Sequence, residues 1–505
     1  MNQVPHLFIF KIPCSVGLAI LVLLSNLIAE PAFALPHQSN SAASQTASQP
    51  NIILVMADDQ GWGQTSYNNH PILRTPNLDA MAASGLRFDR FYAAAPVCSP
   101  TRASVLTGRT NRRTGVESHG YALRLQEKTI AQALQLAGYA TGHFGKWHLN
   151  AMRGPGVPIF ASDSHNPGAF GFQKWLSVTN FFDRDPVMSR AGKFEQFHGD
   201  SSEIIVDEAI KFIESKAQLG TPSFTVIWYG TPHNPFMATE ADTKPFAHLD
   251  KNSKDQHGEL VALDRSMGTL RNALKDMGIA DNTILWFTSD NGGLPKIKPN
   301  TVGGLRGFKG SVYEGGLRVP AIVEWPAQVS PRITKFPAVS MDIFPTIAEI
   351  VGLPSSAMLD TRDGISLKNL FASDIDKRNK PIPFACLGNK AVIDDDIKLV
   401  YAGPKNNKNK NKKFELFDLA SDPKESNNLF KSKPQLATRM IKLMKEFDDS
   451  IEASVAGKDY ASGKLNKENP EPRFWTEVPM YEPYFEKWKT RPEYESWIKK
   501  KLKSK

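Results

Sequence analysis

The sequence predicts an α/β fold: a large mixed, mostly parallel sheet flanked by helices, followed by a smaller C-terminal α+β domain that contains an antiparallel sheet. From residue 51 to about residue 370, short apolar runs alternate with helical patterns, which is typical of a parallel sheet with helices on both faces. After residue 370 the pattern changes to paired strands and a longer helix. A length of 505 residues is enough for two such domains.

Residues 1–34 have the pattern of a signal peptide. Lys11 precedes an apolar run over residues 16–24, and small residues lead to a cleavage site after Ala34. Uncleaved, the segment would be an N-terminal anchor, but the apolar run is short for a bilayer span. Residues 35–50, rich in Ser, Ala and Gln, predict a flexible leader. We therefore expect an exported protein, periplasmic or secreted, with no stable membrane insertion after cleavage.

The large domain, which we place at residues 51–370, begins with the apolar run Asn51 to Met56. Such a run is expected for a strand that is buried on both faces, and it ends just before two acidic residues. The other elements follow in order: a helix over 129–137, a strand over 139–144, a helix over 204–213, a strand over 224–229, a helix with an apolar stripe over 260–274, strands over 283–287 and 319–325, and a helix over 341–351.

The smaller domain, at residues 371–505, begins with a predicted hairpin of strands over 398–401 and 414–417. A helix over 435–447 follows, and the tail after it is rich in aromatic residues. We expect these aromatics to hold an extended segment against the body of the protein, and stacking on a sugar is the alternative. They are Trp475, Tyr481, Tyr484, Phe485, Trp488, Tyr494 and Trp497.

Composition favours an anionic partner and excludes a disulfide scaffold. The 61 Lys and Arg residues exceed the 52 Asp and Glu residues, which gives a net charge of +9. We expect no nucleic acid partner, because no zinc-finger, RNA-recognition or basic-zipper signature is present, whereas a polyanionic saccharide fits the charge. Cleavage after residue 34 leaves only Cys98 and Cys386 of three cysteines, and one disulfide bond between them is an open alternative.

Oxygen-bearing side chains follow two of the predicted buried strands. Asp58 and Asp59 follow the first strand, and Asp290 and Asn291 follow the strand at 283–287. Ligands of such sheets collect at the carboxyl ends of the strands, where both pairs fall. Carboxylate and amide oxygens suit Ca²⁺, with Mg²⁺ as the alternative. Acidic pairs also cap turns, but two pairs after two strands favour a metal site.

A set of basic and imidazole side chains points to an anion. Lys146 and His148 follow a predicted strand, and on extended chain both would lie on one face. His233 follows another strand, and Lys309 lies in a glycine-rich loop. Together with Arg102 these cations could stabilise negative charge in a transition state, and the histidines could move protons near neutral pH.

Three motifs carry a resemblance to a known family. They are Cys98-Ser99-Pro100-Thr101-Arg102, the glycine-rich stretch 307–316, and the stretch 415–429 with its Glu-Leu-Phe-Asp start. The chain resembles the type I, formylglycine-dependent sulfatases, which are arylsulfatase-like and related in fold to the alkaline phosphatases. The resemblance extends from Asn51 to about Phe430.

The resemblance implies that Cys98 is oxidised to formylglycine (3-oxoalanine) by a formylglycine-generating enzyme before the chain folds. The hydrate of this aldehyde is then the nucleophile that attacks sulfur and releases the alcohol. A short helix predicted from Thr101 would place the residue near a helix N-terminus, which favours negative charge. The implied Ca²⁺ ligands are Asp58, Asp59, the modified Cys98, Asp290 and Asn291.

The resemblance also implies roles for the basic residues. Arg102 holds the nucleophile, while Lys146 and Lys309 bind the sulfate oxygens. His233, with Lys309 nearby, assists protonation of the leaving oxygen, and His148 deprotonates the remaining hydroxyl so that sulfate is expelled.

We therefore expect an exported sulfatase that acts on sulfate esters of a small molecule or, above all, of a carbohydrate. A phosphomonoester or phosphonate monoester hydrolase on the same scaffold is one alternative. An inactive protein that binds sulfated glycans is the other.

Overall fold

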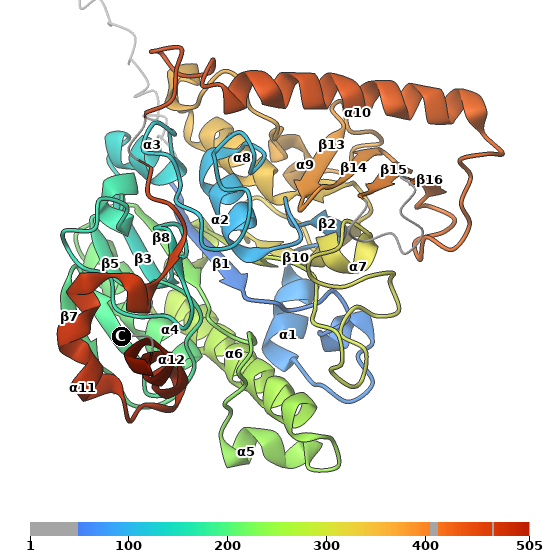
Figure 1. Cartoon of the computed structure of the whole chain (residues 1–505). Coiled ribbons are helices and arrows are strands. Elements are labelled where there is room, and N and C mark those ends of the chain that lie inside the picture. The colour runs from blue at the N-terminus through green and yellow to red at the C-terminus, as the bar shows by residue number, and fades with distance from the viewer. Residues whose placement is uncertain (1–48, 404–412, 467–468, 504–505) are drawn as a thin grey trace, which may run out of the picture. The chain divides into compact units, whose positions relative to one another are not determined.

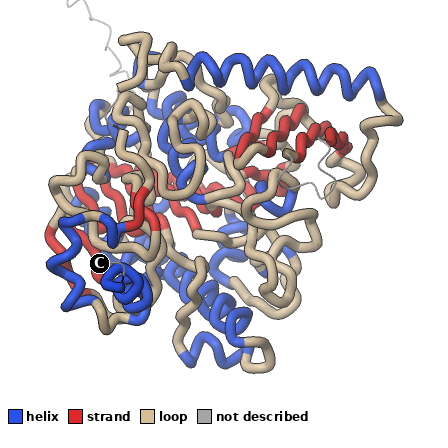
Figure 2. The backbone as a smooth tube through the Cα atoms, viewed as in Figure 1, coloured by secondary structure: helices blue, strands red, loops and turns tan. Residues whose placement is uncertain are grey.

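The computed structural model describes residues 49–403, 413–466 and 469–503 (Figure 1). The predicted signal peptide at 1–34 and all but the last two residues of the leader lie outside this range. Figure 2 shows the strands in a large group and a small group, with helices around both. Among the described residues, no helix combines the length and the apolar character needed to cross a membrane.

The centre of the large sheet is parallel, as predicted. Strand β1 (Asn51–Ala57) lies between β8 (Ser223–Trp228) and β9 (Thr283–Ser289) and runs parallel to both. On one side β3 (Ala140–Lys146) and β5 (Lys174–Val178) continue the parallel order. The rest are β2 (Leu86–Tyr92), β6 (Val187–Arg190), β7 (Lys193–Gln196), β10 (Arg318–Glu324), β11 (Arg332–Thr334) and β12 (Ala338–Val339). Antiparallel pairs of β10 with β9 and β2, and of β6 with β5 and β7, make the sheet mixed.

Strand β1 is buried on both faces because helices cover both sides of the sheet. Ile52, Leu54 and Met56 belong to one apolar core, and the alternate residues Ile53 and Val55 belong to the other. One core includes α2 (Cys98–Thr107), α3 (Ile130–Leu136), α8 (Ile343–Val351) and the short α9 (Lys368–Ala372). The other includes α1 (Pro76–Ser84), α4 (Ser201–Ala217) and α6 (Lys251–Asp276). Short helices α5 (Glu240–Thr243) and α7 (Glu314–Leu317) lie in connections.

The small sheet is antiparallel and contains the predicted hairpin. Its order is β13 (Ile382–Cys386), β14 (Asn389–Asp394), β15 (Ile397–Ala402) and β16 (Lys413–Asp418). One face packs Leu399 and Leu416 against Met440 of helix α10 (Pro434–Val455), which is longer than the predicted helix over 435–447. Phe384 and Phe417 on the other face join a core with Tyr92 of β2 and Leu317 of α7.

The aromatic tail packs on the body, but as short helices and not as the extended segment that we predicted. Strand β17 (Arg473–Phe474) pairs with β4 (Met152–Arg153), and α11 (Phe485–Trp488) and α12 (Pro492–Lys503) follow it near β7 (Figure 1). The aromatic core between tail and body consists of Trp475, Tyr481, Phe485, Trp488 and Tyr494, all buried, with Met152, Val157 and Val187 of the body. These buried rings are not available to stack on a sugar, so that alternative is wrong for them.

The tail core gives a first prediction. Trp475 is fully buried, and its ring lies edge-on to Tyr481 and Tyr494. We expect Trp475→Ala to lower the free energy of unfolding by about 3–5 kcal/mol, because it removes a buried indole and leaves a cavity. Urea unfolding followed by circular dichroism measures this change. The neighbouring variant Phe474→Ala is the control. Because Phe474 is 36% exposed, its removal should lower the free energy of unfolding much less. Equal losses in the two variants would contradict a tail that packs through Trp475.

Candidate active site

The acidic residues converge where strands β1 and β9 end. Ala57 and Ser289 are paired in register, so the residues that follow them emerge side by side. The Asp59 backbone N–H donates to Asp290 Oδ1 at 3.1 Å, and Asn291 Nδ2 donates to Asp59 Oδ1 at 2.7 Å. Asp58, Asp59, Asp290 and Asn291 are all buried. The predicted clustering of both pairs at one edge of the sheet is therefore present.

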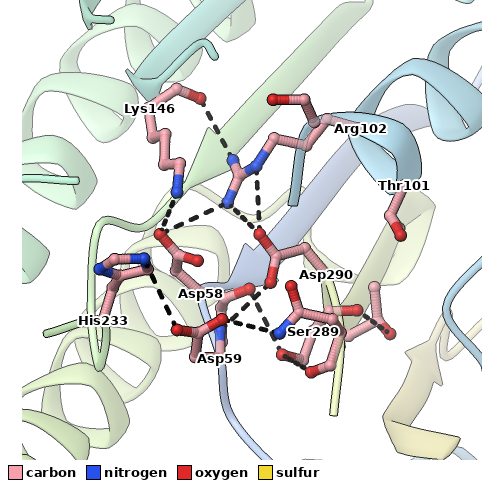
Figure 3. Close-up of polar contacts among 12 residues, drawn as sticks. Asp58, Asp59, Thr101, Arg102, Lys146, His233, Ser289 and Asp290 are labelled. Carbon is pink, nitrogen blue, oxygen red and sulfur yellow. Dashed lines mark hydrogen bonds and ion pairs between the residues drawn. The ribbon is translucent and has the colours of Figure 1, made fainter. Parts of the chain in front are cut away.

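Three basic side chains pair with the three carboxylates. Figure 3 shows Lys146 reaching Asp58, with Nζ 2.5 Å from Oδ2, and Arg102 bonded to Asp290 Oδ2 through Nε at 3.2 Å and Nη2 at 2.7 Å. Lys309 Nζ lies 2.6 Å from Asp59 Oδ1. Arg102 also donates to the Lys146 carbonyl at 3.2 Å and lies over the Trp228 ring.

Helix α2 explains the spacing of the Cys98-to-Arg102 motif. Cys98 is the first residue of the helix, three residues earlier than predicted, and Arg102 follows four residues later on the same face. Pro100 lies in the first turn, where a backbone N–H has no partner within the helix. Thr101 Oγ1 donates to the Ala95 carbonyl at 2.8 Å, and Ser99 Oγ accepts from the Gly120 N–H at 2.9 Å. Each position of the motif thus has a structural or chemical reason.

Burial and charge set the protonation of these groups. Burial raises the pKa of Cys98 to about 12, although Lys146 and Lys309 act against this, so the thiol is protonated at neutral pH. Burial acts to raise the pKa of Asp58, but Lys146, His233 and Arg102 together outweigh it, and the pKa lies below its usual value. The pKa of Asp290 is raised by burial and by the nearby Asp58.

His148 and His233 border the carboxylates from two loops. His148 is buried, both of its ring nitrogens lack a hydrogen-bond partner among the described residues, and burial together with Lys146 holds its pKa well below the usual value. His233 stacks on Phe181, and its Nε2 lies 3.7 Å from Asp59 Oδ2. Burial and the charge of Lys309 lower the pKa of His233 to about 4.

The backbone around His148 differs from our prediction of extended chain. Strand β3 ends at Lys146, and His148 has a left-handed backbone with φ of 57°. Its N–H donates to the Thr179 carbonyl at 2.9 Å, which holds the chain at the point where it turns. Lys146 and His148 are therefore brought to one site by this turn and not by strand alternation.

The donor atoms fit a hard divalent cation. One ligand atom each from Asp58, Asp59, Cys98 and His233 lie within 4.8 Å of one another. Asp58 Oδ1 and Asn291 Oδ1 are buried and have no hydrogen-bond partner within the described part of the chain. Buried carboxylate and amide oxygens of this kind are the ligands of Ca²⁺ or Mg²⁺.

His119, which was not among the predicted site residues, lies in a loop beside this site. The N–H of the next residue, Gly120, bonds to Ser99, the neighbour of Cys98. The charges of Arg153, Lys309 and Lys146 all act on the His119 imidazole. No motif marks this histidine, because only the folding of the loop over α2 brings it to the site.

Comparison with known proteins identifies the family. The sulfatase family matches residues 50–353. Arylsulfatase A of Homo sapiens is 32% identical over 365 residues, covering 65% of this chain and 69% of that protein. N-acetylgalactosamine-6-sulfatase of Canis lupus familiaris is 31% identical over 350 residues, covering 62% and 65%. The crystal structure of Ps i-CgsB in complex with k-i-k-neocarrahexaose superimposes with a TM-score of 0.71 at 25% identity and covers 89% of this chain and all of that one. The chain therefore belongs to the sulfatase family and is a sulfuric ester hydrolase.

Proposed function

We propose that this protein, exported from the cell, hydrolyses sulfate esters of a carbohydrate with formylglycine at position 98 and a bound divalent cation. The observation that carries the proposal is the position of Cys98: it begins α2 beside three carboxylates and three cations, and it is buried. The carbohydrate follows from the relatives, one named for N-acetylgalactosamine and one bound to a neocarrahexaose.

An unmodified thiol is poorly suited to this position. With a pKa of about 12, Cys98 holds almost no thiolate at neutral pH, and the thiolate is the reactive form of cysteine. Both Cys98 and Cys386 are free in the structure, so no disulfide explains Cys98. Oxidation to formylglycine by a formylglycine-generating enzyme replaces the thiol by an aldehyde, whose hydrate supplies an oxygen nucleophile.

The cation would be Ca²⁺, with Mg²⁺ as the alternative, held by Asp58, Asp59, residue 98, Asp290 and Asn291. When bound, it supplies positive charge next to the sulfate and favours the ionised form of a coordinated oxygen. The three carboxylates balance Arg102, Lys146 and Lys309, so the dication makes the centre net positive. A positive, largely buried centre of this kind would attract the singly charged sulfate ester.

The remaining residues hold the reacting groups in place or transfer protons. Lys146 pairs with Asp58 and Lys309 with the adjacent Asp59, and we assign both lysines to the sulfate oxygens. Arg102 is fixed by Asp290 and by the Lys146 carbonyl, and it holds residue 98 in place. His148 is neutral and has free ring nitrogens, which suits a general base. His233 and Lys309 both contact Asp59, and we assign protonation of the leaving oxygen to this pair.

The chemical form of residue 98 is the most direct test. In protein purified from its native host, we expect mass spectrometry to find the peptide that contains residue 98 lighter than its cysteine form and reactive towards hydrazides, as an aldehyde is. The peptide that contains Cys386 is the internal control and should keep its thiol. A free thiol at 98 in that protein, or a bond to Cys386, would refute the modification and favour an inactive glycan-binding protein.

Metal binding is tested by thermal unfolding. We expect chelation to lower the Tm of the wild-type protein and Ca²⁺ to restore it, because the ion binds only the folded carboxylate cluster. Asp59→Asn should lose most of this Ca²⁺ response. Asp448→Asn, which removes a carboxylate that pairs with Lys390 elsewhere, should keep it. A Tm that does not respond to Ca²⁺ or Mg²⁺ in the wild type would rule out the cation site.

Matched aryl esters separate the sulfatase from the phosphoester hydrolase. We expect kcat/KM for 4-nitrophenyl sulfate to exceed that for 4-nitrophenyl phosphate by a large factor, because the balanced centre plus a dication suits a singly charged ester. Lys146→Ala should lower kcat for the sulfate by about 100- to 1,000-fold, the usual loss on removing one preorganised group that stabilises charge. Preference for the phosphate would reverse the assignment.

A further inference from the structure

A loop and a short strand form the wall of the active site next to His148. The N–H of Gly120 bonds to Ser99 Oγ, and the N–H of Leu123 bonds to the Leu149 carbonyl at 3.0 Å. The segment 118–123 is therefore fixed between the start of α2 and the chain that follows His148. Strand β4 comes from that same chain and ends at Arg153.

Arg153 lies along this wall without a charged partner. A Cβ built on Gly120 would meet Arg153 Cγ at 2.6 Å, so the arginine side chain runs across the bare backbone of Gly120. Its guanidinium lies over the Tyr121 ring, 5.8 Å from the centroid. Within the described residues it forms no ion pair, and its Nε is buried without a hydrogen-bond partner. A half-buried guanidinium with free donors is costly unless an anion pairs with it.

Arg153 and the active-site lysines act electrostatically on the same residue, His119. Partial burial and the charges of Arg153, Lys309 and Lys146 lower the pKa of His119. The imidazole is thus influenced both by the arginine of the wall and by the two lysines that we assign to the scissile sulfate. Arg153 also runs across Gly120, whose N–H bonds to Ser99 beside Cys98, so the arginine borders the same site.

Tyr121 connects this arginine to a pocket with room for a sugar. The pocket has a volume of about 320 Å³ and is lined by Ser118 and Tyr121 on one side and by the turn 385–390 on the other. Two cations also line it, but both are paired: Arg112 with Glu452 at 2.9 Å and Lys390 with Asp448 at 2.7 Å. Glu117 is the acidic side chain of the lining, and Arg153, which lies over Tyr121 beside the pocket, is a cation without an ion pair among the described residues.

The tail fixes the position of Arg153. Phe474 of β17 pairs with Arg153 in a parallel ladder, and the Arg473 N–H bonds to the Ala151 carbonyl at 3.0 Å. Trp475 follows directly and is fully buried. The backbone that carries the arginine is thus held by residues far apart in the sequence.

We propose that Arg153 is a specificity-determining residue that binds an anionic group, a sulfate or a carboxylate, on the sugar next to the one that carries the scissile ester. This inference rests on the proposed carbohydrate substrate. A guanidinium binds both groups through two parallel charge-assisted hydrogen bonds, which are stronger than bonds to neutral groups. The enzyme therefore selects saccharides with anionic groups on adjacent sugars.

The test uses inhibition of 4-nitrophenyl sulfate hydrolysis by three saccharides. They are N-acetylgalactosamine 6-sulfate, the disaccharide that links it to a uronic acid, and that disaccharide with a second sulfate on the uronic acid. The first has one anion, the second adds a carboxylate, and the third adds a sulfate as well. We expect the wild type to bind one or both of the disaccharides at least tenfold more tightly than the monosaccharide. Tight binding of the second saccharide would identify a carboxylate as the anion, and tight binding of the third alone would identify a sulfate.

The variant Arg153→Ala should bind the preferred disaccharide about 10- to 100-fold more weakly, the range expected on loss of charge-assisted bonds, and so lose most of that preference. Arg153→Lys should restore it in part, because a lysine keeps the charge and loses the paired geometry. Arg112→Ala, which removes a paired cation of the same pocket, should keep it. A preference that is absent in the wild type, or unchanged in Arg153→Ala, would overturn the proposal. Hydrolysis of the aryl ester itself reports on the proposed sulfatase function. Failure of that function is therefore distinguishable from failure of the proposed role of Arg153.

Discussion

The site depends on the balance of three buried carboxylates by three buried or half-buried cations. Asp58, Asp59 and Asp290 would repel one another at the closely spaced ends of β1 and β9, and burial acts to raise the pKa of Asp58 and of Asp290. Arg102 and Lys146 act against this effect by pairing with Asp290 and Asp58. The cations come from α2, β3 and the loop at 309, so the balance also requires these segments to be held at the ends of the two strands.

The alkaline phosphatase-like sheet supplies that arrangement. Parallel β1, β8, β9 and β3 all end at the same edge, and a residue that follows each of them faces the same space. Apolar side chains of these strands pack into two cores, one on each face of the sheet. Because the strands cannot shift in register without exposing these cores, the residues beyond their ends keep fixed positions. Rigid packing of the sheet is thus what allows like charges to be held a few ångströms apart.

The sequence was sufficient to predict the parts that are apolar and continuous. β1, β8 and β9 were predicted because strands buried on both faces have uninterrupted apolar runs, and the acidic pairs stood out at their ends. Strand β2 was missed because its Leu-Arg-Phe-Asp pattern carries charges to a less buried face. The turn at His148 and the wall formed by His119 and Arg153 could not be predicted, since they depend on long-range pairing such as that of β17 with β4.

The pairing of β17 with β4 also separates two properties of the enzyme along the chain. The groups assigned to the chemistry lie between Asp58 and Lys309, whereas the strand that secures the wall beside them comes from residues 473–474. A ribosome completes the first long before it makes the second. Replacing the last few dozen residues would therefore change the support beneath Arg153, while the arginine itself and the reaction centre remain encoded upstream.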